Sequence, residues 1–143
     1  MMPKTIRILA ALSVIFFLQT GPEANAESPV VKELVKSTRS WNGATLPAYP
    51  KGRPEITILR ISIPPGARLE THSHPVINAG VLISGQLTVL TTDGKTLHLN
   101  AGDPIVEVVN TWHYGINPGK VSADIIVFYA GIMDMPITVK EPQ

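Results

Sequence analysis

The sequence contains no cysteine, and its 12 basic and 11 acidic residues nearly cancel. The absence of cysteine excludes a disulfide framework and a thiol nucleophile. No basic patch argues for nucleic acid as a partner, and no run of like charge argues for a membrane surface. Internal repeats and low-complexity segments are missing as well. A chain of 143 residues with these properties is expected to form one small domain held together by its own hydrophobic core.

The only long apolar run belongs to a segment with the plan of a secretory signal peptide, residues 1–26. Lys4 and Arg7 precede an apolar stretch at 8–18, and small residues end the segment at Ala26. We expect cleavage after Ala26, export to the periplasm or beyond, and no membrane partner afterwards. An uncleaved anchor is the alternative, although the apolar stretch is short for a membrane span. Loss of Lys4, Arg7 and Glu23 would leave ten basic and ten acidic residues.

Most of the remaining chain has the pattern of short strands separated by Gly, Pro and Asp turns. We expect strands at 55–63, 76–83, 86–92, 96–99, 104–109 and 122–130. Even spacing of short strands indicates a sandwich or a barrel. We therefore predict an arm or loop over 27–54, a β-barrel over 55–137 and a tail over 138–143. Residues 28–38 fit either a helix that Ser28 would cap or a strand, with the strand preferred.

Three of the four histidines have a spacing that can close on one metal ion. His72, His74 and Asn78 share parity, so their side chains would point to the same face of a continuous strand. His113 follows the apolar strand at 104–109 and can approach from across a barrel. Neutral imidazole is the commonest side-chain metal ligand, and three histidines leave coordination positions free for water or substrate. The sequence therefore predicts a metal site inside the barrel.

The residues around these histidines resemble the two signatures of the cupin superfamily. The first signature is similar to the run Gly66-x5-His72-x-His74-x3-Asn78-x6-Gly85, and the second to Gly102-x5-Val108-x-Asn110-x2-His113-x3-Asn117. Asn78 stands where the family usually has glutamate. The resemblance implies an all-β, single-domain cupin jelly roll, also called a double-stranded β-helix. It further implies that His72, His74 and His113 bind a divalent metal, and that the protein pairs into homodimers.

Asparagine at position 78 has a chemical consequence for such a metal. Three imidazoles and an amide leave the charge of a divalent ion uncompensated, which strengthens the Lewis acid and attracts small anionic chelators. Loss of a hard oxygen anion disfavours manganese and favours Fe, Ni, Cu or Zn. Asn78 would either ligate weakly or hydrogen-bond a bound water. Three-histidine iron centres of this type resemble those of the thiol- and diketone-cleaving cupin dioxygenases.

Four further residues have two interpretations each. Glu107 is the one acid in an apolar strand, so we expect it at the surface, whereas an inward position would make it a further ligand or a general base. Tyr114 follows His113; core packing is its default role, and a catalytic place in the pocket is the alternative. Arg60 is a surface charge or a clamp for a substrate carboxylate. His98 lies between two leucines and is expected to face solvent.

Two classes of function follow from these predictions. An enzyme would be a metal-dependent oxygenase or isomerase acting on a small chelating acid or enolate, with Glu107 or a metal-bound water moving the proton. A non-catalytic module would use the same metal to hold a small anion for storage, sensing or delivery. The open metal centre favours the enzyme, which is the preferred interpretation. The lack of a dedicated acid–base residue in the two signatures favours the binding module.

Overall fold

The computed structural model describes residues 27–142 of the chain. The chain divides into two units, Met1–Val31 and Lys32–Gln143. In the first unit only residues 27–31 are described, and they are exposed and without regular secondary structure. The expected signal peptide and its cleavage site lie outside the described residues. Within residues 27–142, no helix is long and apolar enough to cross a membrane.

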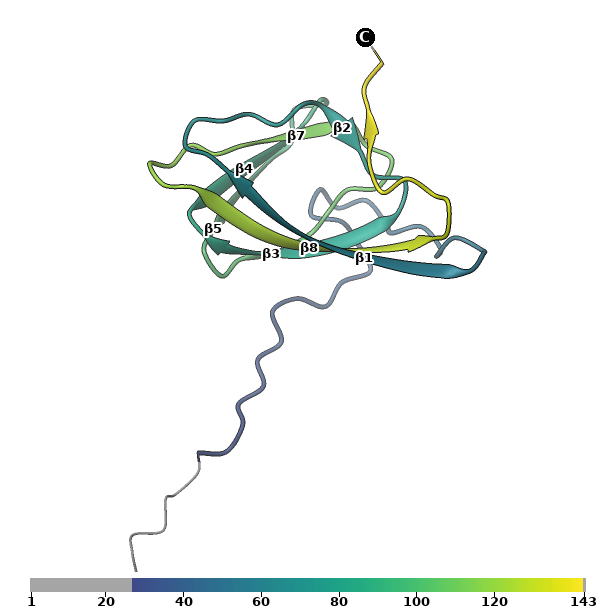
Figure 1. Ribbon diagram of the computed structural model, residues 1–143, viewed down its shortest axis with the longest axis horizontal. Coiled ribbons are helices and arrows are strands. Elements are labelled where there is room, and N and C mark those ends of the chain that lie inside the picture. The colour runs from purple at the N-terminus through teal and green to yellow at the C-terminus, as the bar shows by residue number, and fades with distance from the viewer. Residues whose placement is uncertain (1–26, 143) are drawn as a thin grey trace, which may run out of the picture. The chain divides into compact units, whose positions relative to one another are not determined.

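The described part of the second unit is all-β, with nine strands in two antiparallel sheets (Figure 1). The strands are β1 (Pro54–Ile63), β2 (His72–Ser73), β3 (Ile77–Ser84), β4 (Gln86–Thr91), β5 (Thr96–Asn100), β6 (Pro104–Val106), β7 (His113–Ile116), β8 (Ala123–Ile132) and β9 (Val139–Lys140). One sheet has the order β1-β8-β3-β6, and the other has the order β5-β4-β7-β2-β9. The predicted jelly roll is confirmed.

Alternation along the strands creates the core between the two sheets. On β8, Ala123, Ile125, Val127 and Tyr129 are buried, whereas the residues between them are more exposed. Successive side chains of a strand point to opposite faces, so this pattern fixes which face of β8 packs inward. Leu82 of β3 is fully buried in the same cluster. The core is apolar at the end of the barrel away from the histidines.

The β4–β5 hairpin forms where its sequence indicates. Gly94 has a φ of +92°, a conformation that residues with a side chain rarely adopt. The backbone amide of Thr91 donates to the carbonyl of Lys95 at 3.0 Å and closes the turn. The Asp93-Gly94 step is thus the register-setting turn of this hairpin.

Two expectations about the secondary structure are wrong. Residues 28–37 form neither a helix nor a strand, and Leu34 and Val35 remain exposed. An apolar stretch without a neighbouring strand has no partner for its backbone, so its β-type composition is not sufficient to make a strand. The strand expected at 104–109 ends at Val106. Beyond it the chain leaves the sheet, and Asn110 adopts a positive φ of 52°.

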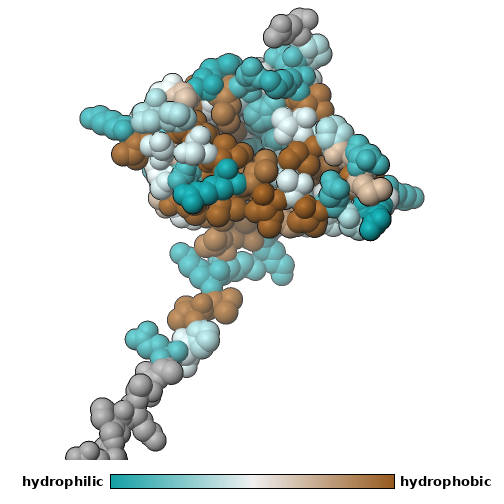
Figure 2. Space-filling view, viewed as in Figure 1, coloured by the Kyte–Doolittle hydropathy of each residue, from teal (hydrophilic) through white to brown (hydrophobic). Residues whose placement is uncertain are grey.

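The outer face of the β1-β8-β3-β6 sheet is unusually apolar. Ile56, Ile58, Ile83, Ile126 and Phe128 are all exposed. In Figure 2, hydrophobic residues gather along the lower side of the view, over β1, β8 and β3. Two shallow apolar hollows lie on this face, and Phe128 lines both of them.

Asn117 joins three segments of the barrel from a fully buried position. Its Nδ2 donates to the carbonyls of Ile63 and Val121, both at 2.8 Å, and its Oδ1 accepts from the amide of Gly119 at 2.8 Å. We predict that Asn117→Ala lowers the free energy of unfolding by about 3 kcal/mol, because it leaves buried backbone groups without partners. Urea denaturation measures the change. Asn42→Ala, which removes one exposed hydrogen bond to Ala44, is the control and is expected to cost less than about 1 kcal/mol. Equal losses would contradict the assigned role of Asn117.

Candidate metal centre

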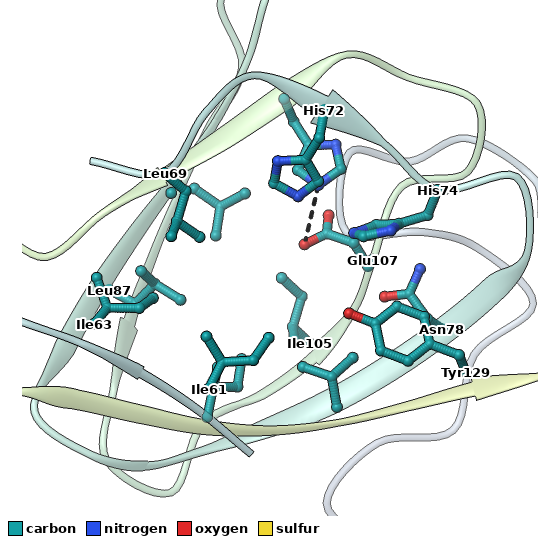
Figure 3. A pocket seen from close by; sticks show the side chains of 15 residues that line it. Ile61, Ile63, Leu69, His72, His74, Asn78, Leu87, Ile105, Glu107 and Tyr129 are labelled. Carbon is teal, nitrogen blue, oxygen red and sulfur yellow. Dashed lines mark ion pairs between the residues drawn. The ribbon is translucent and has the colours of Figure 1, made fainter. Parts of the chain in front are cut away.

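Three histidines from neighbouring strands converge at the inner face of the second sheet (Figure 3). His72 on β2 lies directly opposite His113 on β7 in the sheet register, and His74 follows immediately after β2. Their ring centroids are 4.4 to 5.0 Å apart. One nitrogen from each ring lies within 4.8 Å of the other two. The structure thus brings together the three residues that the spacing singled out.

Hydrogen bonds on the far side of each ring determine which nitrogen faces the centre. Nδ1 of His72 lies 2.7 Å from the carbonyl of Glu70. Nδ1 of His74 and of His113 lie 2.8 Å from the carbonyls of Ile137 and Thr111. A carbonyl oxygen only accepts, so each Nδ1 carries the proton and each Nε2 keeps its lone pair. Metal-bound histidines are usually oriented by such a bond. Three inward lone pairs fit a divalent transition metal.

Burial favours the neutral form of His72 and His74, which is the form that a metal requires. It lowers the pKa of His74 to about 4, although the bond to the Ile137 carbonyl partly opposes the shift. Burial also lowers the pKa of His72 from its ordinary value. Near neutral pH both rings are therefore uncharged and ready to ligate.

Glu107 lies inside the barrel, so the expectation that it faces solvent is wrong. It is only 9% exposed, and its Oε2 is 3.9 Å from Nε2 of His113 (dashed line in Figure 3). Its Oε1 accepts hydrogen bonds from the indole Nε1 of Trp41 and from the amide of Val108, both at 2.8 Å. Buried carboxylates need such donors. The early end of β6 and the loop containing Trp41 provide them.

The carboxylate of Glu107 supplies a negative charge that the asparagine at position 78 does not. Among the described residues that line the cavity, it is the only acidic side chain. A divalent ion held by the three histidines would have this negative charge nearby, although position 78 is an amide. The argument against manganese from the missing glutamate therefore loses its basis.

Asn78 and Tyr129 face each other across β3 and β8 at the edge of the histidine cluster. Asn78 is 1% exposed; its Nδ2 donates to the carbonyl of Val76 at 3.3 Å, and its Oδ1 has no partner. An unpaired buried acceptor calls for a donor from a bound molecule. Burial, with a smaller contribution from Glu107, raises the pKa of Tyr129 to about 12, so its hydroxyl stays protonated. No sequence pattern indicates a role for Tyr129.

The structure settles three other interpretations. Tyr114 does not line the cavity; it lies on the opposite face of β7 from His113, under the guanidinium of Arg68 at 3.8 Å, so its catalytic assignment is wrong. Arg60 is a surface charge and pairs with Asp124 at 2.8 Å. His98 is exposed, as expected.

The cavity below the histidines has one polar end and apolar walls. Its volume is about 60 Å³, which is room for a few water-sized groups. The walls are formed by Ile61, Ile63, Leu69, Leu87, Val89, Ile105, Ile125 and Val127. Such walls exclude water from a molecule that reaches the polar end.

Comparison with known proteins shows that the chain belongs to the cupin superfamily. The cupin domain family matches residues 59–129, and no curated protein matches the chain. A Klebsiella pneumoniae protein with a double-stranded β-helix domain is 18% identical to this chain, with a TM-score of 0.53. The alignment covers 78% of this chain and the whole of the Klebsiella chain. An oxalate oxidase in complex with glycolate is 24% identical at a TM-score of 0.52, and a Bacillus subtilis oxalate decarboxylase with Mn(II) centres is 28% identical at 0.50. Each aligns over 59% of this chain, which spans 45% of the oxidase chain and 23% of the decarboxylase chain.

The lowered pKa of His74 predicts how the stability of the metal-free protein depends on pH. The unfolded chain takes up a proton at the ordinary value of 6.5, whereas the folded protein does so only near 4. The neutral His74 imidazole therefore contributes fully to the free energy of unfolding above pH 6.5, and this contribution is lost as the pH falls to 4. We expect a loss on the order of 3 kcal/mol from His74, with His72 adding in the same direction.

Urea denaturation in EDTA between pH 7.5 and 4 measures this dependence. Carboxylates also titrate towards the acid end, so the comparison with a His74→Gln variant isolates the contribution of the imidazole. The variant should show a flatter profile. Identical slopes for the two proteins would refute the assignment.

Proposed function

We propose that this protein is an exported cupin that binds one divalent transition metal through Nε2 of His72, His74 and His113 and acts on a small chelating molecule. The observation that carries the proposal is the convergence of three Nε2 lone pairs, each fixed by a backbone carbonyl behind its ring. The pattern of residues 1–26 supports export. An oxalate oxidase and an oxalate decarboxylase among the structural relatives support a small acid as the ligand.

The chemistry we favour is that of a metal-dependent oxygenase or isomerase. When bound, the metal would polarise the oxygen atoms of the ligand. Oε2 of Glu107 accepts none of the hydrogen bonds found among the described residues, and it would accept a proton from the ligand. The hydroxyl of Tyr129 would donate a hydrogen bond, and Oδ1 of Asn78 would accept one. The apolar walls would keep other water away from the reacting atoms.

Metal analysis and turnover test the proposal together. Protein recovered from the periplasm should contain close to one equivalent of a divalent metal, among Fe, Ni, Cu, Zn and Mn. The double variant His72→Ala/His113→Ala should lose it, because two of three ligands are gone. His98→Ala is the matched control, since His98 is exposed and bonds only Thr88 at 3.1 Å. It should retain the metal in full.

Oxygen uptake and product analysis with small hydroxy acids, oxalate, diketones, thiols and catechols then separate the two classes of function. Turnover that requires the metal and falls at least about a hundredfold in Glu107→Gln supports the enzyme. Tight binding of a small acid without turnover supports the alternative, a non-catalytic binding module. Absence of metal from the wild-type protein contradicts both.

We also propose that two copies pair through the outer face of the β1-β8-β3-β6 sheet. This face exposes large apolar side chains in one patch, which is uncommon on a monomer. The double variant Ile58→Asp/Phe128→Asp should shift the protein from dimer to monomer in light scattering. Val121→Asp, an exposed apolar residue outside the four strands, is the control and should remain dimeric. A wild-type protein that is monomeric at micromolar concentration would refute the pairing.

A further inference from the structure

A small hairpin of the N-terminal arm, residues 38–46, reaches the metal centre from outside the matched cupin domain. We call it the arm hairpin. Its own backbone bonds join Ser40 to Ala44 at 2.8 Å and Leu46 to Thr38 at 3.0 Å. It precedes the family match, which begins at residue 59. The family resemblance therefore assigns it no role.

Three hydrogen bonds connect the arm hairpin to Val106 and Glu107. The hydroxyl of Ser40 donates to the carbonyl of Glu107 at 2.9 Å, and the amide of Trp41 donates to the carbonyl of Val106 at 2.9 Å. The indole Nε1 of Trp41 donates to Oε1 of Glu107 at 2.8 Å. The arm hairpin thus forms hydrogen bonds with both the backbone and the side chain of Glu107.

The two carboxylate oxygens of Glu107 differ in their hydrogen bonding. Oε1 is occupied by Trp41 and by the amide of Val108. Both of these bonds go to Oε1, and within residues 27–142 no hydrogen bond to Oε2 is found; Oε2 lies 3.9 Å from Nε2 of His113. A hydrogen bond to a charged group is short and directional, so the indole restricts rotation of the carboxylate. The backbone of Glu107 is held on its other side as well, because its amide donates to the carbonyl of Asn78 at 3.0 Å.

We propose that Trp41 is a positioning residue of the metal centre, which acts through Glu107 by holding Oε2 towards the three histidines. The inference rests on the proposed metal binding and extends the site to a segment outside the cupin domain. Glu107 contributes its negative charge beside the ion, and Trp41 fixes where that charge lies. Partners behind a metal site commonly change metal affinity by 10- to 100-fold when they are removed.

A double-mutant cycle on metal affinity tests the inference without any assay of activity. The dissociation constant for Co²⁺ and the visible spectrum of the Co²⁺ form are measured for the wild type, Trp41→Phe, Glu107→Ala and the double variant. Phenylalanine keeps an aromatic ring and removes the N–H donor, although it is smaller than tryptophan. We expect Trp41→Phe to weaken Co²⁺ binding by about tenfold and to alter the spectrum. In the Glu107→Ala background the same change should alter the affinity by less than about twofold.

Arg39→Ala is the matched control for the arm hairpin. It removes the bond from the Arg39 guanidinium to the carbonyl of Gly43 at 2.9 Å and leaves Trp41 and Glu107 intact. Its Co²⁺ affinity should equal that of the wild type. Thermal melting verifies that each variant is folded, and Glu107→Gln replaces Glu107→Ala if the latter does not fold.

Two results would overturn the inference and leave the proposed function intact. One is a Trp41→Phe protein with wild-type Co²⁺ affinity and spectrum, when His72→Ala has lost the metal. The other is an equal loss in the presence and absence of Glu107, which would mean that Trp41 acts on the fold and not through the carboxylate. A wild-type protein that binds no Co²⁺ would refute the proposed function itself, and this inference with it.

Discussion

The candidate metal centre depends on the hydrogen bonds between each imidazole Nδ1 and a backbone carbonyl behind the ring. An imidazole that could turn about its χ2 angle would offer either nitrogen, and three such rings would not present their lone pairs to one point. The carbonyls of Glu70 and Thr111 are each two residues from the histidine that they fix, so the local backbone provides them. The carbonyl of Ile137 is 63 residues from His74, and only the closed barrel brings it there. The tautomer of His74 therefore depends on tertiary structure, because the segment that contains Ile137 orients this ring.

The polar end of the cavity is dominated by hydrogen-bond acceptors. The three Nε2 atoms, Oε2 of Glu107 and Oδ1 of Asn78 present lone pairs, and Oδ1 of Asn78 has no hydrogen-bond partner in the part of the chain that the structure describes; Tyr129 contributes a hydroxyl. Acceptors gathered in an apolar cavity repel one another unless a cation or a donor lies between them. The arrangement therefore fits a metal ion together with a ligand that carries protons. It fits an unaccompanied anion poorly, and this is the reason to place the chelating molecule on the metal and its exchangeable proton near Glu107.

Parity and turn chemistry made the main features of the fold predictable. His72 and His74 share a face because they are two residues apart, and Asp93-Gly94 closes the hairpin that it indicates. The same parity rule places Tyr114 on the opposite face from His113, so its exclusion from the cavity was available from the sequence. Glu107 was not predictable in this way. The expected strand at 104–109 has apolar residues on both faces, so alternation alone does not say which face is inward. The donor that satisfies the buried carboxylate comes from Trp41, 66 residues earlier in the chain. Tyr129 becomes recognisable only once β8 is known to lie beside β3, opposite Asn78.

Two of the groups that shape the site lie outside the region that defines the family. The cupin match spans residues 59–129 and contains the three histidines, whereas Trp41 precedes it and Ile137 follows it. One fold supports many reactions, because chemistry depends on the local site and not on the barrel. In this protein the barrel sets where the imidazoles stand, and the flanking segments set the tautomer of His74 and the orientation of the Glu107 carboxylate. The two signatures therefore do not contain all of the groups that shape the candidate site, because the hydrogen bonds from Trp41 and to Ile137 come from the flanking segments.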